Sequence, residues 1–155
     1  MILSQTAVYA LRATLCLASH DSSSPLRVDD IAGQLDVPRN YLSKILHALA
    51  RGGVLVSSRG PGGGFRLAKA ADELSLAEVV AHFDQVSENP ACLLGRPECS
   101  DHNPCSAHDR WKRASAAVAE FFRQTSIADL AAPPKAAGTR KPSATRSASR
   151  AREPR

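Results

Sequence analysis

VLVSSRGPGGGFRL, at residues 54–67, is the stretch that decides the fold. Its two ends, residues 54–56 and 65–67, are short and rich in apolar residues, which predicts two β-strands. Residues 57–64 between them form a loop whose one charged side chain is Arg59. We interpret this hairpin as a wing, because glycines let a backbone approach a phosphodiester closely and an arginine can enter a narrow minor groove. The candidate DNA contacts of the wing are Arg59, Gly60, Pro61, Gly62 and Gly63.

The glycine-rich loop has two other interpretations. A nucleotide-binding loop would read G-x4-G-K-[ST] and would open a helix directly after the glycines, and this stretch has neither feature. A flexible hairpin that only connects two strands is the second alternative. The residues on the N-terminal side of the loop favour the wing.

Residues 28–51 predict two short helices joined by a tight turn, the form of a helix-turn-helix. Pro38 suits the first position of the second helix, because its φ is already helical and its missing N–H is not needed there. The apolar positions that this helix should bury are Leu42, Ile45, Leu46 and Leu49. Such pairs also serve as scaffolding, but beside a wing the free face of the second helix suits DNA. Its candidate contacts are Pro38, Arg39, Asn40, Tyr41, Ser43 and Lys44.

The charges of the chain are unevenly distributed. Seven Lys or Arg and one Glu in residues 135–155 give +6, so a net charge of +5 leaves residues 1–134 at −1. No Asp or Glu lies between residues 37 and 71, where the basic residues are Arg39, Lys44, Arg51, Arg59, Arg66 and Lys69. This local basic surface suits phosphates.

Two more helices complete a predicted DNA-binding domain at residues 1–84. Ser4 can cap a helix that runs to about His20, in which Cys16 is interpreted as a small buried hydrophobe. Ser75 and Glu78 form a capping box that opens a short helix. The apolar run at residues 7–18 is too short to span a bilayer and lacks a basic leader, so we expect a soluble cytoplasmic protein without a membrane segment.

Residues 85–105 are predicted to form a cysteine-rich loop that wraps a metal centre. The spacing from Cys92 through Cys99 and Cys105 to His108 is C-x6-C-x5-C-x2-H, which no single helix or strand can present. Thiolates and imidazole suit zinc or iron-sulfur clusters. A cluster is favoured because the C-x2-C and C-x4-C knuckles typical of structural zinc are missing. The alternatives are a disulfide and unconnected thiols. A reducing cytosol disfavours a stable disulfide.

A long helix at residues 106–132 is predicted to follow, with Ser106 as its N-cap. One stripe of it consists of Trp111, Ser115, Val118, Phe122 and Thr125. We expect a dimerisation helix, with packing against its own domain as the alternative. Residues 133–155 then form a basic, disordered tail, which either adds non-specific DNA affinity or has no task. The predicted fold is therefore mainly α with a small β-hairpin wing, a winged helix-turn-helix plus a long dimerisation helix.

Residues 4 to about 130 resemble the Rrf2 family of IscR and NsrR. Residues 59–67 look like that family's wing, residues 37–42 look like the start of its recognition helix, and Cys92, Cys99 and Cys105 match its cluster cysteines. The resemblance implies a homodimeric transcriptional regulator whose iron-sulfur cluster reports iron-sulfur supply, redox state or nitric oxide. The family also has members without a cluster. The first cysteine gap departs from the usual x5, and Val8 stands where some nitric-oxide-sensing members supply a carboxylate.

His108 is the expected fourth ligand of a [2Fe-2S] cluster with the three cysteines. It lies three residues after Cys105, so both can face the same side of one helical turn, and IscR-like members place a histidine at this offset. His102, beside Asn103 and Pro104, is expected to face solvent. The alternative is a [4Fe-4S] cluster with an outside fourth ligand.

We expect a DNA-binding transcriptional regulator, most simply a repressor on a pseudo-palindromic operator, and not an enzyme. A cluster-free thiol switch of the same fold is the alternative of the same class. An iron-sulfur carrier would use the same cysteines, but would not need basic side chains on a helix face and a wing. A thiol enzyme could pair Cys105 with His108, but the sequence suggests no substrate pocket.

Overall fold

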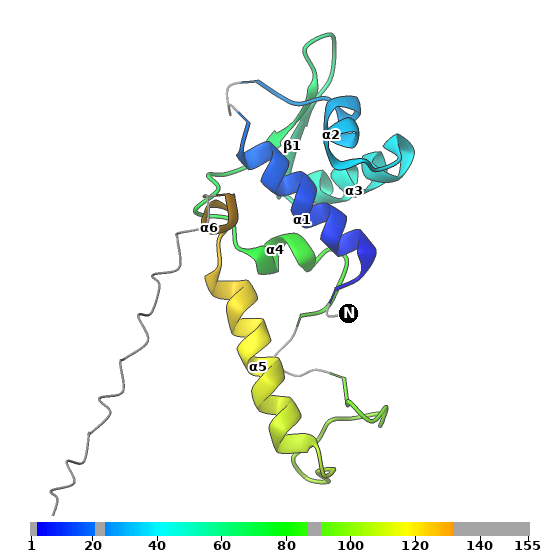
Figure 1. Cartoon of the computed structure of the whole chain (residues 1–155), viewed down its shortest axis with the longest axis vertical. Helices are drawn as coiled ribbons and strands as arrows, with labels where there is room; N and C mark the ends of the chain where they lie inside the picture. Colours follow the sequence, from blue (N-terminus) through cyan, green and yellow to red (C-terminus); the bar gives the residue numbers. More distant parts are fainter. Residues whose placement is uncertain (1–2, 21–23, 87–90, 132–155) are drawn as a thin grey trace, which may run out of the picture.

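The computed structural model describes residues 3–20, 24–86 and 91–131 (Figure 1). Within these ranges the chain is mainly helical, with one two-stranded antiparallel sheet. The elements are α1 (Gln5–Ala18), α2 (Val28–Leu35), α3 (Arg39–Arg51), β1 (Leu55–Ser58), β2 (Gly64–Leu67), α4 (Leu76–Val80), α5 (His108–Gln124) and α6 (Ile127–Ala131). The predicted winged helix-turn-helix is confirmed. The predicted tail at residues 133–155 lies outside the described residues.

The turn between α2 and α3 forms as predicted, with one shift. Asp36 ends α2 in the left-handed conformation, at φ 53°, and Val37 is buried. Pro38 is the N-cap of α3 rather than its first residue, because its carbonyl accepts from the N–H groups of Tyr41 and Leu42 while its own ψ of 126° is not helical. The four core positions predicted for this helix are all buried: Leu42, Ile45, Leu46 and Leu49.

The wing consists of β1 and β2, paired from Leu55 with Leu67 to Ser58 with Gly64. Each strand runs further into the loop than the sequence predicted. At Gly64 a Cβ would lie 2.3 Å from the carbonyl oxygen of Leu26, which pairs with β2 through an isolated bridge to Phe65. Gly64 is therefore required by packing within the protein.

The core lies where α1 meets α3, α4 and α6, all of which contact it. Ser4 caps α1 by accepting from the Ala7 N–H, and the capping box of Ser75 and Glu78 opens α4, so both predicted caps are confirmed. Cys16 is only half-buried at the edge of the core, where its Sγ lies 3.0 Å from Gln34 Oε1. Cys16 therefore packs against the core as predicted, although it is only partly buried.

The predicted helix at residues 106–132 was wrong at both ends. The N–H of His108 bonds to the Cys105 carbonyl in a turn, so Ser106 lies inside that turn and Ala107 is the N-cap. At the other end Thr125 is extended and its carbonyl accepts from the Leu76 N–H. Ile127 then begins a separate helix, α6, and is fully buried.

This break gives α5 its place in the molecule. Ser126 forms an antiparallel bridge with Ser75, and the Ile127 N–H bonds to the Leu74 carbonyl, which fixes the C-terminal end of α5 to the winged body. The N-terminal end of α5 extends away from that body and carries the cysteine-rich loop (Figure 1). Within the described ranges, no helix is both long and apolar enough to cross a membrane.

Candidate DNA interface and cysteine centre

The start of α3 presents most of the predicted DNA contacts to solvent. Pro38, Arg39, Asn40 and Lys44 are exposed and Ser43 is half-buried on the same helix. Tyr41 is directed elsewhere, because its hydroxyl lies 2.6 Å from Thr6 Oγ1 and its ring packs edge-on against Tyr9 of α1. In the isolated protein Tyr41 therefore joins α3 to α1, and its contact with DNA stays a prediction.

A cleft of about 470 Å³ separates the wing from the start of α2 and α3. The predicted DNA contacts Arg39 and Arg59 both line this cleft. The other polar side chains that line it are Arg27, Asp29, His47, Ser57 and Ser58. The recognition helix and the wing therefore form one surface, with three arginines around a depression.

Three residues of this surface were not predicted from the sequence. Arg27 donates to the Pro61 carbonyl of the wing at 3.2 Å, and Asp29 pairs with Arg39 at 2.5 Å. His47 packs edge-on against Phe65 of β2. Arg27 and Asp29 precede the basic stretch, so no charge pattern indicated that they belong to this surface. His47 could have been predicted as part of it, because it lies one turn after Ser43 on α3.

Two of the predicted ligands are in contact at the N-terminal end of α5, where Cys99 Sγ lies 3.5 Å from His108 Nδ1. Beyond the effect of burial, Cys92 and Cys105 lie near enough to raise the pKa of Cys99. His108 is only 4% exposed and Cys92 is also buried. The Trp111 indole of α5 donates to the Ala91 carbonyl and holds the loop against the helix. Within the loop, the Arg96 side chain donates to the Asn103 carbonyl.

The thiols differ in their electrostatic surroundings. The backbone N–H groups of Arg96 and Leu94 donate to the Cys92 sulfur and lower the pKa of that thiol, with further help from Cys105. Burial raises the pKa of Cys99, and the nearby negative charges of Cys92 and Cys105 raise it further. Thiolates that repel one another in this way would be stabilised by a cation among them.

Asp101 connects the loop to α5. Its Oδ1 lies 2.7 Å from His108 Nε2, and both of its oxygens accept from Lys112 Nζ, at 2.9 and 2.7 Å. Lys112, followed by His108, lowers the pKa of Asp101 to about 2, so this carboxylate is ionised at neutral pH. His102 is exposed, as predicted from its place in the loop.

The donor types at this end of α5 suit an iron-sulfur cluster, which takes thiolate and imidazole ligands. Among the described residues, however, no group of three or more Cys, His, Asp or Glu side chains lies close enough together to hold a metal ion. The residues present therefore fit the predicted cluster in chemistry, and the geometry of its ligands stays a prediction.

The comparisons with known proteins identify the family. Residues 3–133 match the Rrf2 family, described as iron-dependent transcriptional regulators. The chain belongs to the Rrf2 family. It is accordingly a DNA-binding transcriptional regulator and not an enzyme.

Individual relatives agree with this assignment. A putative HTH-type transcriptional regulator of Aquifex aeolicus is 36% identical over 132 residues, which are 84% of this chain and 91% of that protein. The HTH-type transcriptional regulator IscR of Vibrio atlanticus is 30% identical over 122 residues, 79% of this chain and 70% of that protein. In structure, this Rrf2 regulator resembles CymR, the global cysteine regulator of B. subtilis, with a TM-score of 0.73 at 22% identity, over 84% of this chain and 96% of the other.

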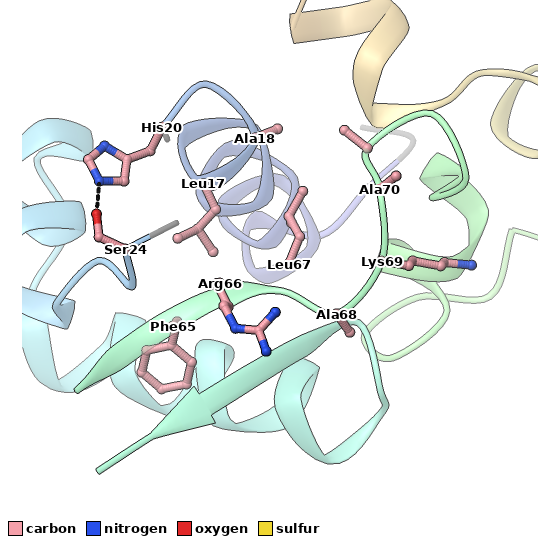
Figure 2. Close-up of a pocket in the computed structure, with 11 residues that line it drawn as sticks. Leu17, Ala18, His20, Ser24, Phe65, Arg66, Leu67, Ala68, Lys69 and Ala70 are labelled. Carbon is pink, nitrogen blue, oxygen red and sulfur yellow. Dashed lines mark hydrogen bonds between the residues drawn. The ribbon is translucent and has the colours of Figure 1, made fainter. Parts of the chain in front are cut away.

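A separate hollow of about 510 Å³ lies between the end of α1 and the segment that follows β2 (Figure 2). Leu17 and Leu67 line it, and His20 bonds to Ser24 at its edge. None of the predicted DNA contacts or cluster ligands lines this hollow. In this Rrf2 regulator the candidate chemistry therefore lies elsewhere, at the wing cleft and at the cysteine-rich loop.

Proposed function

We propose that this Rrf2 regulator is a homodimeric repressor that binds a pseudo-palindromic operator and is switched by an iron-sulfur cluster, [2Fe-2S] in preference to [4Fe-4S]. Cys92, Cys99, Cys105 and His108 hold the cluster. The observation that carries the proposal is the contact of Cys99 Sγ with His108 Nδ1, 3.5 Å apart at one end of α5, with Cys92 and Cys105 near enough to raise the pKa of Cys99. A cluster bound there would supply a centre that responds to oxidants, nitric oxide or iron-sulfur supply.

The exposed apolar residues near the end of α5 support a dimer. Phe121 is 52% exposed and Leu130 of α6 is 45% exposed. Large apolar side chains on one exposed region are typical of protein interfaces. We assign this surface to a second copy of the chain, since regulators that read palindromic sites are two-fold symmetric.

The position of His108 provides a route from the loop to DNA. His108 is both a proposed ligand and the first residue of α5, while the last residues of α5 are tied to α4 and the winged body. A change in how the loop packs on His108 therefore acts directly on the helix that joins the winged body to the dimer interface. Because half-sites lie at fixed helical intervals, a small change in the spacing of two recognition helices costs a large part of specific affinity.

The cluster-free thiol switch keeps one observation in its favour, the influence of Cys105 on Cys92, where it helps to lower the pKa of the thiol. Oxidation of this pair to a disulfide would also change the loop. The two functions differ in colour, because only the cluster absorbs visible light.

The test is anaerobic purification of the full chain, followed by iron and sulfide analysis, Mössbauer spectroscopy and operator binding before and after cluster removal. We expect about two irons and two sulfides per subunit for a [2Fe-2S] centre, and different operator affinities for the two forms. A colourless, iron-free protein whose affinity responds to a thiol oxidant would establish the thiol switch instead.

His108→Ala and His102→Ala form a matched pair for the fourth ligand. We expect His108→Ala to change the visible spectrum and shorten the lifetime of the cluster, and His102→Ala to leave both unchanged, since His102 is exposed in the loop. A four-iron Mössbauer spectrum, or a His108→Ala cluster that is unaltered, would exclude His108 as the ligand.

A further inference from the structure

His108 has a defined partner at each of its ring nitrogens. Nε2 faces Asp101 Oδ1 at 2.7 Å, and Nδ1 faces Cys99 Sγ at 3.5 Å. Both oxygens of Asp101 accept from Lys112 Nζ, so Oδ1 is an acceptor in its contact with His108 and the hydrogen of that bond lies on Nε2. In a neutral imidazole the other nitrogen, Nδ1, then carries the free lone pair, and it points toward the cysteines.

We propose that Asp101 is a positioning residue, which fixes His108 with its proton on Nε2 and so makes Nδ1 the nitrogen presented to the cluster site. This inference rests on the proposed function for its purpose. It names the ligand atom and the residue that selects it, neither of which the C-x6-C-x5-C-x2-H spacing specifies.

Lys112 makes the arrangement rigid. It donates to both oxygens of Asp101, which is otherwise an exposed loop residue. Lys112 lies four residues after His108 on α5, so the two side chains lie on the same face of the helix. The helix thus holds the imidazole and the cation at a fixed spacing, and Asp101 bridges them.

A carboxylate on the second nitrogen of a ligating histidine is a recurrent device in metal sites. It fixes the ring orientation and raises the basicity of the ligating nitrogen, and its loss typically costs about 10- to 100-fold in metal affinity or activity. Asp101 acts on the cluster only through His108, so its removal should be felt at one ligand while the three thiolates stay in place.

The first experiment uses the full-length, cluster-free, reduced protein at a pH where the imidazole is neutral. Long-range ¹H–¹⁵N correlation spectra distinguish the two tautomers of a histidine ring. We expect the wild type to hold His108 with its proton on Nε2, and Asp101→Ala to populate the Nδ1–H form. Asp109→Asn is the matched control, because Asp109 is the next residue of α5 and is exposed. It should leave the tautomer of His108 unchanged.

The second experiment measures the reconstituted proteins. Asp101→Ala should shift the reduction potential of the cluster and lower its affinity about 10- to 100-fold, and Lys112→Met should have a smaller effect in the same direction. Asp101→Glu should recover part of the loss. Circular dichroism of each variant checks that α5 is intact.

The outcomes separate this inference from the proposed function. A wild-type His108 with its proton on Nδ1, or an Asp101→Ala spectrum identical to wild type, overturns the role of Asp101 whatever the protein binds. If the tautomer responds as expected but the protein never takes up iron and sulfide, the positioning of His108 stands and the cluster proposal fails.

Discussion

At the scale of single residues, Arg59 is the side chain of the wing that we expect to matter most for DNA binding. It is the one charged group of the loop at residues 57–64. It is exposed and lines the cleft next to the recognition helix. We predict that Arg59→Ala weakens binding to the cognate operator by about 1 to 3 kcal/mol and to random duplex by less, since a minor-groove arginine reads groove width. Fluorescence anisotropy on both duplexes measures the difference. Equal losses of affinity on the two duplexes would indicate that Arg59 contacts a phosphate. No loss on either duplex would indicate that Arg59 does not take part in DNA recognition.

Asp29 places a negative charge inside the basic cleft, where it pairs with Arg39. We predict that Asp29→Asn raises affinity for any duplex and steepens the log–log salt dependence by about one unit, because Arg39 becomes available to a phosphate. Stability should change by less than about 1 kcal/mol, as both partners are exposed. Asp30→Asn removes the same charge from the next residue of α2, which does not line the cleft, and should have the smaller effect. Identical salt slopes for the two variants would place Arg39 away from the phosphates.

The sequence could point to candidate residues that lie close together along the chain, but not to pairs that only the fold brings into contact. Cys92, Cys99, Cys105 and His108 lie in a short segment with an unusual composition, so they could be selected without a structure. Lys112 could not, because its role depends on a loop carboxylate 11 positions away that only the folded chain brings to it. Pairs of this kind leave no periodic signal.

At the scale of single elements, the decisive feature is the break between α5 and α6. Ser126 Oγ accepts from the Asp129 N–H, and the Asp129 carboxylate accepts from the Ser126 N–H, so these residues form a capping box. We predict that Ser126→Ala lowers the free energy of unfolding by about 0.5 to 2 kcal/mol, whereas Ser106→Ala changes it by less than about 0.5 kcal/mol. Urea unfolding followed by circular dichroism gives both values. A larger loss at Ser106 would mean that Ser106 caps α5, and no loss at Ser126 would contradict the capping box at the start of α6.

Most elements could be predicted because their apolar spacing is regular. The face of α3 was identified completely, and the Ser75 capping box located α4. The α5–α6 break was missed although its signal, Ser126 followed by Asp129, is of the same kind as the one recognised at Ser75. Apolar residues continue at helical spacing through Thr125, so the periodicity concealed a boundary that the backbone pairing with residues 74–76 imposes.

At the scale of the whole molecule, the charge distribution leads to a prediction about residues 135–155. Their net charge is +6 and that of residues 1–134 is −1. We predict that deleting residues 135–155 lowers affinity for all duplexes and reduces the salt slope by nearly one unit for each Lys or Arg that contacts a phosphate. The ratio of operator to random binding should remain the same. An unchanged slope in salt titrations would mean that this segment does not contact DNA.

The overall arrangement was only partly accessible from the sequence. A winged helix-turn-helix followed from local patterns, but a separate helix α6 was not predicted. This helix contacts α1, and its Ile127 is completely buried in the same core as Leu46 and Val79. The order of the segments suggested that the winged body and the long helix are separate, whereas the chain packs against the winged body again after α5.

That return has a consequence for biosynthesis. Chains fold as units from the N-terminus while they are being made, but the winged body cannot close its core until Ile127 has been synthesised. Before then, the backbone groups of Ala71, Leu74 and Leu76 lack the partners that residues 125–128 supply. A nascent or prematurely terminated chain would therefore carry the recognition helix and the wing on an incomplete body, exposed to proteases. The cysteine-rich loop lies in the sequence between residues 1–84 and Ile127, which together form the core. A chain with a complete core therefore always contains the loop when it binds DNA.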